Sequence, residues 1–155
     1  MIVRRAERKD KEDWAKLRNA LWPDELSAHK LDIESFFDLS SVHIVEVFVL
    51  DNENDEVVGF IELNIRSHAE GIDARGVPYV EGWFIDSEYR GKGFGKLLLR
   101  QAESWAQRQG YQWLASDSDI NNHVSIACHK AVGFTEMARN VCFAKNLRLH
   151  QELKD

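Results

Sequence analysis

Residues 80–96 read VEGWFIDSEYRGKGFGK, and this stretch decides the fold. An apolar run enters a loop with three alternating glycines and two cations, Arg90 and Lys92, and a helical pattern follows. Glycine lets successive backbone N–H groups converge on one anion, and a helix start adds unpaired N–H groups and its positive dipole end. The stretch therefore predicts a strand that carries the chemistry, a pyrophosphate-binding turn and a helix.

The flanking sequence predicts one α/β domain over residues 1–146 and a charged C-terminal tail over residues 147–155. Apolar spacing indicates strands and helices that build a mixed sheet. The loop over residues 68–78 is either a substrate flap or a solvated connector. The expected strands cover residues 2–6, 43–50, 57–65, 79–85, 113–116 and 134–145, and the expected helices cover 10–22, 24–37, 93–109 and 125–132.

Bulk composition narrows the class of protein. The chain has 155 residues, 44% of them hydrophobic, and a net charge of -6, which disfavours a general nucleic-acid binder. No apolar run approaches the roughly 20 residues of a membrane span, and the N-terminus lacks a long apolar signal region. We expect a cytoplasmic protein without a membrane or nucleic-acid partner. Cys128 and Cys142 have apolar neighbours, so we expect two buried structural thiols.

Two motifs in order along the chain carry a family resemblance. Arg90-x-x-Gly93-x-Gly95 follows a strand, and Gly133-Phe134 later closes a helix. This arrangement resembles the GCN5-related N-acetyltransferase (GNAT) superfamily. A dinucleotide site is disfavoured, because its glycine-rich turn would follow the first strand of the domain.

Within that superfamily, the chain is similar to the bacterial aminoglycoside 6'-N-acetyltransferases. The local features are Trp14 and Leu17-Arg18-Asn19 leading to Leu21-Trp22-Pro23, then Glu81-Gly82, then Ala115-Ser116-Asp117, then His129 before Gly133-Phe134. The resemblance implies a GNAT fold: α/β, with a mixed, mostly antiparallel sheet of six to seven strands, about four helices and splayed central strands. It implies acetyl-coenzyme A as co-substrate, and no metal.

The resemblance also implies where coenzyme A binds. The pyrophosphate would lie on the amides of Arg90, Gly91, Lys92, Gly93, Phe94, Gly95 and Lys96. Trp83, Phe84 and Ile85 would line the pantetheine arm, with the Trp83 N–H polarising the thioester carbonyl. Asn122 would begin the helix beside the cofactor, although Asn is also an ordinary helix cap. Strand alternation predicts Glu81, Trp83 and Ile85 on one side, and Gly82 and Phe84 on the other.

An amine acceptor is bound as a cation and must lose a proton, so its site is expected to contain carboxylates. Glu81 and Asp117 are expected to face the gap between two strands, bind the ammonium and take its proton. Trp22 and Glu25 would form one wall of the acceptor cleft, because an aromatic plane flanked by acids suits a polycation. Glu136 is the nearest acidic candidate after Gly133-Phe134. His129 stands where many superfamily members carry a tyrosine acid.

The sequence thus predicts an acetyl-coenzyme A-dependent aminoglycoside 6'-N-acetyltransferase that works by direct attack in a ternary complex. One alternative is a GNAT enzyme for a polyamine, an amino sugar or a protein amine. Another is a non-catalytic acyl-coenzyme A-binding module. Two chains are expected to associate as a homodimer, because the apolar stretch Met137 to Lys145 suits pairing with a partner's sheet.

Overall fold

The structure is a computed structural model that describes residues 1–148. It divides into two compact units, Met1–Asp119 and Ile120–Asp155, which are described separately. Most of the predicted tail, residues 149–155, lies outside the described residues. Among the described residues, no helix has both the length and the apolar content that crossing a membrane requires.

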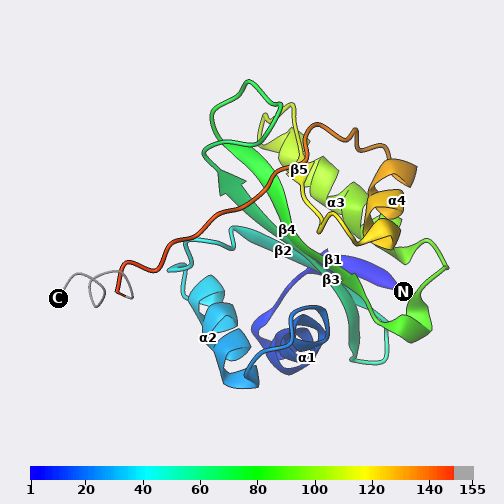
Figure 1. Cartoon of the computed structure of the whole chain (residues 1–155). Helices are drawn as coiled ribbons and strands as arrows, with labels where there is room; N and C mark the ends of the chain where they lie inside the picture. Colours follow the sequence, from blue (N-terminus) through cyan, green and yellow to red (C-terminus); the bar gives the residue numbers. More distant parts are fainter. Residues whose placement is uncertain (149–155) are drawn as a thin grey trace. The chain divides into compact units, whose positions relative to one another are not determined.

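The first unit is built on one five-stranded sheet in the order β1-β2-β3-β4-β5 (Figure 1). The first four strands are antiparallel neighbours, and β4 and β5 run parallel. This confirms the predicted α/β fold with a mixed, mostly antiparallel sheet. The strands are β1 (Ile2–Arg5), β2 (Glu46–Asp51), β3 (Val57–Arg66), β4 (Val77–Ile85) and β5 (Ala115–Ser116).

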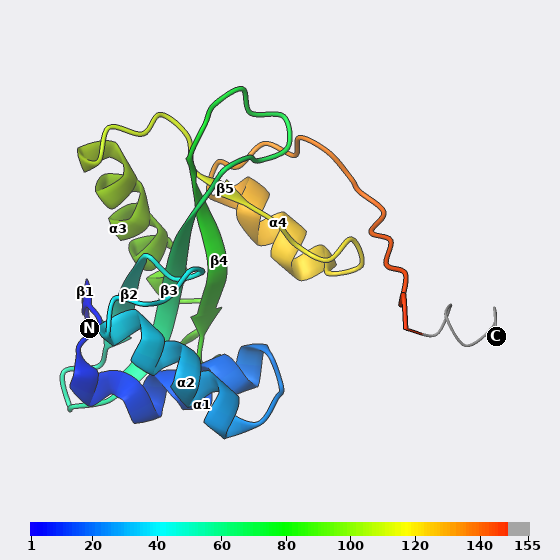
Figure 2. The ribbon, with the colours of Figure 1, turned by 90° about the vertical axis from the view of Figure 1, so that its left-hand side faces the viewer.

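Helices cover both faces of this sheet. α1 (Lys11–Leu21) and α2 (Leu26–Phe37) lie side by side on one face, and α3 (Phe94–Arg108) lies on the other (Figures 1 and 2). Cover on both faces explains why β2 and most of β3 are buried without alternation. Short 3-10 turns, Arg8–Asp10 and Ser87–Tyr89, precede α1 and the glycine loop.

Aromatic packing fixes α1 and α2 against the sheet. Trp14 is fully buried and meets the edge of Phe36 at 5.6 Å between ring centroids. Phe60 of β3 belongs to the same core cluster. Burying each such side chain stabilises the fold by roughly 1.5–3 kcal/mol. α1 ends at Leu21, because the residue before Pro23 avoids helical geometry, and Trp22 is thereby held at the sheet.

β4 contains a bulge at Glu81. Glu62 pairs with Gly82, but the next residue, Leu63, pairs with Val80, so Glu81 is an extra residue without a counterpart. A bulge breaks strict alternation, because two consecutive residues oppose one partner.

The bulge corrects one expectation from strand alternation. The Glu81 side chain accepts hydrogen bonds from Asn64 and Arg66. These residues alternate along β3 with Glu62 and so share its face. Glu81 therefore lies with Gly82 on the α1 side of the sheet, and not on the side predicted for Trp83.

The parallel strands part soon after they meet. The β4–β5 ladder has two pairs, Tyr79 with Ala115 and Val80 with Ser116, and the bulge follows directly. This agrees with the splayed strands that the family resemblance implied.

The predicted strand over residues 134–145 is wrong. Residues 134–146 form no strand among the described residues, and the sheet has five strands rather than six to seven. Val141 is 77% exposed and Phe143 is 92% exposed, although both have apolar, strand-like neighbours in the sequence. A strand needs a bonded neighbour, which β propensity does not supply.

In the described part of the second unit, residues 120–148, the structure has one helix, α4 (His123–Ala131). The Asn122 side chain caps it by accepting a hydrogen bond from the Ser125 N–H at 3.0 Å. α4 ends at Ala131, one residue before the predicted Val132, and the predicted terminating residue Gly133 follows the C-cap with φ at +103°. The prediction of two buried thiols is wrong, because Cys128 and Cys142 are both exposed. α4 has no buried residue, so no core surrounds Cys128.

Candidate active site

The glycine loop runs directly into α3. Gly93 occupies the N-cap position with φ at +81°, a left-handed conformation that glycine adopts without strain. The N–H groups of the first helical turn have no partner within a helix, so they are available to an anion. Lys92 donates to the Glu88 carbonyl oxygen at 3.1 Å, and Arg90 donates to the Ile85 carbonyl oxygen at 2.7 Å. These contacts hold both predicted cations close to the loop.

The third glycine of the loop has a different role from the other two. The Trp83 indole N–H donates to the Gly95 carbonyl oxygen at 3.0 Å, and a Cβ at Gly95 would lie 3.3 Å from Trp83 Cζ2. Gly95 therefore lets the indole pack against the first turn of α3. This contact joins the strand predicted for the pantetheine arm to the loop predicted for the pyrophosphate.

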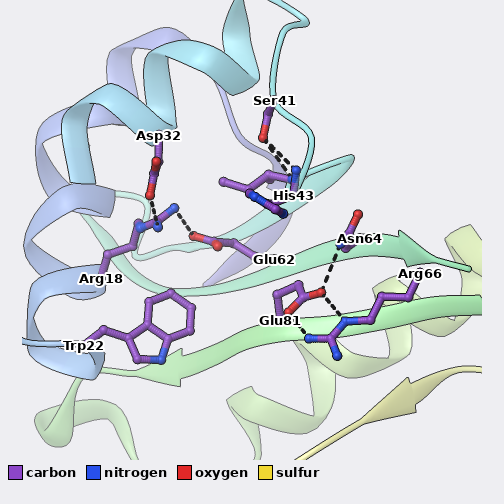
Figure 3. A pocket seen from close by; sticks show the side chains of 10 residues that line it. Arg18, Trp22, Asp32, Ser41, His43, Glu62, Asn64, Arg66 and Glu81 are labelled. Carbon is purple, nitrogen blue, oxygen red and sulfur yellow. Dashed lines mark hydrogen bonds and ion pairs between the residues drawn. The ribbon is translucent and has the colours of Figure 1, made fainter. Parts of the chain in front are cut away.

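A pocket of about 370 Å³ lies between the sheet and the α1–α2 pair (Figure 3). Trp22 and Glu81, both predicted to bind the acceptor, are part of its lining. A Cβ at Gly82 would lie 2.5 Å from Trp22 Cη2, so the indole rests on the backbone of β4. The full lining is Arg18, Trp22, Asp32, Ser41, His43, Ile44, Glu62, Asn64, Arg66 and Glu81.

A buried ionic network supports the Trp22 wall. Arg18 Nη1 lies 3.1 Å from Glu62 Oε1, and Arg18 Nη2 lies 2.8 Å from Asp32 Oδ2. The Trp14 indole N–H also donates to Glu62, at 2.8 Å. Burial raises the pKa of Glu62 to about 7, against the opposing influence of Arg18.

The same arginine positions Trp22 by two routes. Its guanidinium carbon lies 5.4 Å from the centroid of the Trp22 ring. Arg18 Nε also donates to His29 Nδ1 at 3.3 Å, and His29 Nε2 lies 2.9 Å from the Trp22 carbonyl oxygen. Because a carbonyl only accepts, His29 carries its proton on Nε2.

Glu81 is held as a carboxylate. Arg66 binds it with both ends of its fork, Nε to Oε1 at 2.8 Å and Nη2 to Oε2 at 2.7 Å, and Asn64 adds a bond of 3.1 Å. Burial raises the pKa of Glu81, but the hydrogen bonds from Arg66 and Asn64 outweigh it and leave the pKa below its ordinary value.

Asp117 lies near the same guanidinium nitrogen, Nη2, that binds Glu81. Its Oδ2 accepts from the Tyr79 hydroxyl at 2.7 Å and lies 3.9 Å from Arg66 Nη2. Arg66 stacks on the Tyr79 ring, with its guanidinium carbon 3.6 Å from the centroid. Burial and the bond to Asp117 raise the pKa of Tyr79. The structure thus brings the two predicted carboxylates to one cation.

Glu25, a predicted acceptor residue, is exposed at the N-cap of α2 and is not part of the pocket lining. Asn122 and Glu136 belong to the second unit, where Glu136 pairs with Arg139 and with Lys130. His129 Nδ1 donates to the Ser125 carbonyl oxygen at 2.7 Å, so its hydrogen-bonded state agrees with a structural role.

The loop before β4 is anchored at one end. Ala69 and Ile72 form an isolated bridge, and Ala69 is buried in a small cluster with Val77, Tyr79 and Ala115. A second, open pocket of about 720 Å³ lies in this loop, lined by Ser67, His68, Gly71, Ile72, Asp73, Ala74 and Arg75.

Sequence reasoning missed the polar row on β3, namely Glu62, Asn64 and Arg66. Its signal is an alternation of these residues with apolar Ile61, Leu63 and Ile65. A polar face on a strand that helices cover indicates a cavity or an ionic network. Among residues 1–148, no three His, Cys, Asp or Glu side chains are grouped to hold a metal ion.

Comparison with known proteins identifies the family. The sequence profile of the Acetyltransferase (GNAT) family matches residues 11–134. The chain therefore belongs to this acetyltransferase family, which confirms the family predicted from the glycine loop.

The more particular resemblance is confirmed by the relatives. The aminoglycoside N(6')-acetyltransferase type 1 of Klebsiella aerogenes is 35% identical over 147 residues, which cover 94% of this chain and 97% of that protein. The protein of the same name from Stenotrophomonas maltophilia is 33% identical over 142 residues, which cover 91% of this chain and 90% of that protein.

Solved structures agree in fold. The aminoglycoside 6'-N-acetyltransferase AAC(6')-IG from Acinetobacter haemolyticus superposes with a TM-score of 0.85 at 28% identity, covering 95% of this chain and 99% of that one. AAC(6')-Iy, in complex with the bisubstrate analogue CoA-S-monomethyl-acetylneamine, gives a TM-score of 0.84 at 29% identity, covering 94% and 97%.

Proposed function

We propose that this protein transfers the acetyl group of acetyl-coenzyme A to the 6'-amine of aminoglycosides. The observation that carries the proposal is the bulge at Glu81, which aims a carboxylate into the Trp22 pocket on the strand that leads into the glycine loop. The relatives named as aminoglycoside N(6')-acetyltransferases support the choice of acceptor.

The coenzyme would lie along β4 and the loop after it. The amides of residues 90–96 bind its pyrophosphate, and Arg90, Lys92 and Lys96 add positive charge. Trp83, Phe84 and Ile85 line the pantetheine arm, and Asn122 contributes from the start of α4. A backbone donor at the thioester oxygen, assigned here to Trp83, is worth about 3 kcal/mol in such reactions.

The aminoglycoside would lie in the Trp22 pocket. Its ammonium groups bind Glu81 and Asp117, and a sugar ring lies against the Trp22 indole, an arrangement that suits a polycation. Glu25 and Glu136 are the remaining predicted acceptor residues and supply further negative charge.

The reaction needs a neutral amine. The ammonium loses a proton to Glu81, directly or through a water molecule. The nitrogen lone pair attacks the thioester carbonyl carbon, so that a C–N bond forms and the C–S bond breaks. The sulfur leaves as a thiolate, and the second proton, which the attacking nitrogen loses as it becomes an amide nitrogen, passes through water to that thiolate. The products are the N-acetylated aminoglycoside and free coenzyme A.

The molecular context is also part of the proposal. Residues 1–146 act as one acetyltransferase domain, and the enzyme works in the cytoplasm without a metal, membrane or nucleic-acid partner. Two chains form a homodimer through residues 137–145, because the exposed Val141 and Phe143 gain an apolar neighbour there.

The test is acetyl transfer to kanamycin or tobramycin, with the modified nitrogen assigned by NMR. A polyamine, glucosamine and a lysine peptide serve as comparison acceptors, and calorimetry measures acetyl-coenzyme A binding separately. Acetylation at the 6'-nitrogen is expected. Turnover of only a comparison acceptor, or no coenzyme binding, would overturn the proposal.

A further inference from the structure

Arg66 occupies the place where a positively charged acceptor is expected. It binds both oxygens of Glu81, at 2.8 and 2.7 Å, and stacks on the Tyr79 ring. A second carboxylate, Asp117, lies 3.9 Å from the same guanidinium nitrogen, Nη2 (Figure 3 shows the pair with Glu81). The expected cation site thus already contains a cation, the Arg66 guanidinium, which lies near the carboxylates of both Glu81 and Asp117.

The two members of the pair differ in exposure. The Glu81 side chain is 21% exposed and the Arg66 side chain 40%, while Asp117 is 71% exposed. Glu81 is also fixed by Asn64. The arginine is therefore the member that can move outward, and Asp117 offers it a carboxylate on the solvent side.

We propose that Arg66 is the resident counter-ion of the acceptor site: it holds Glu81 in ligand-free protein and passes to Asp117 when a substrate ammonium takes its place. Arg66 is a positioning and specificity residue and does not touch the reacting atoms. The inference rests on the proposed function and deepens it by stating what the acceptor must displace.

The exchange selects for polycationic acceptors. A bidentate guanidinium–carboxylate pair is a strong charge-assisted contact, so one ammonium replaces it at a disadvantage. An acceptor with several ammonium groups recovers this loss, because its other charges are attracted by the remaining acids. A monoamine has no such compensation.

Several charged groups around Glu81 would respond to the change. They are Glu62 and Arg66 on β3, Tyr79 on β4, Asp117 after β5, His43 before β2, Arg18 on α1 and Asp32 on α2. A carbon-13 NMR titration of the Glu81 carboxyl separates its protonation from that of the others.

The experiment compares the wild-type protein with Arg66→Gln and Arg66→Lys. Arg108→Gln, at an exposed residue of α3, is the control for loss of one positive charge. In Arg66→Gln, the Glu81 carboxyl should titrate at higher pH, and the acid limb of kcat/KM should follow. KM for tobramycin should fall, on the order of tenfold for one charge-assisted contact. The preference for tobramycin over glucosamine should shrink. Arg66→Lys keeps the charge but not the bidentate contact, so its acid limb should lie between those of the wild-type protein and Arg66→Gln, and Arg108→Gln should change none of these.

Two failures remain distinguishable. If the wild-type protein acetylates no aminoglycoside, the proposed function fails. If it does, but Arg66→Gln raises KM for tobramycin or leaves the Glu81 titration and the acid limb unmoved, the role of Arg66 is overturned. Circular dichroism checks folding. If Arg66→Gln misfolds, Arg66→Lys decides, and an acid limb at the wild-type position in that variant contradicts the inference.

Discussion

The Trp22 indole rests on the backbone of Gly82, where a side chain would place Cβ 2.5 Å from Cη2. The wall of the pocket and the strand beneath it therefore fit only because residue 82 has no side chain. The contact joins the end of α1 to the residue that follows the bulge, so the shape of the pocket depends on both.

Gly82→Ala should displace Trp22 and weaken acceptor binding. We expect KM for tobramycin to rise on the order of tenfold and stability to fall by about 1–3 kcal/mol, the usual cost of overpacking. Steady-state kinetics and urea unfolding measure the two effects. Trp22→Phe removes the clashing atoms, so Gly82→Ala should cost less stability in that background. Equal costs in both backgrounds would contradict the contact.

Glu62 should make stability depend on pH. Its pKa in the folded protein, about 7, lies above the ordinary 4.5, so the folded state binds the proton more tightly. The contribution of Glu62 to stability is therefore fully present below its pKa in the unfolded chain and is lost as pH rises through its pKa in the folded protein. Roughly 1 kcal/mol of this loss falls between pH 6 and 8. Urea unfolding at both pH values should show this decline in the wild-type protein and in Glu56→Gln, an exposed control, but a smaller one in Glu62→Gln. An unchanged slope in Glu62→Gln would exclude Glu62 as its source.

Glu81→Gln should lower turnover because it removes the proposed proton acceptor. A loss of roughly 10²–10⁴ in kcat is expected for a general base. The acid limb of the pH profile should also disappear. Glu12→Gln, an exposed change on α1, serves as the matched control and should retain activity. Wild-type turnover in Glu81→Gln would remove Glu81 from the chemistry.

Phe143→Asp should weaken self-association. Phe143 is 92% exposed, and burying such an apolar ring against a partner chain would stabilise the dimer. Light scattering and sedimentation over a range of concentrations should show a dimer for the wild-type protein and more monomer for the variant. Leu39→Asp, an equally exposed residue on the first unit, is the control. A monomeric wild-type protein would end the dimer proposal.

The sequence predicted the fold where local signals were strong. The loop from Arg90 to Gly95 and the apolar spacing around Trp14 each specify local structure, and both were found. The final strand was not found, because residues 134–145 have strand-like composition but no bonded neighbour in the structure. The resemblance implied splayed central strands, but the bulge at Glu81 was not located from the sequence, and strand alternation put the Glu81 side chain on the wrong face.

The ionic contacts around the site were beyond sequence reasoning. Arg66 and Tyr79 are far from Asp117 along the chain, and only the pairing of three strands brings them together. Glu81 and Asp117 were predicted from their motifs, but nothing in the motifs indicates that an arginine links them. Such contacts depend on tertiary packing rather than on residue spacing.

The extra residue in β4 has a consequence for how this enzyme class varies. Without Glu81, Val80 would adjoin Gly82 and the ladder with β3 would continue in regular pairs. The acid is thus an insertion that the sheet does not require. Its replacement or loss would alter chemistry at that point while leaving the neighbouring hydrogen-bonded framework intact.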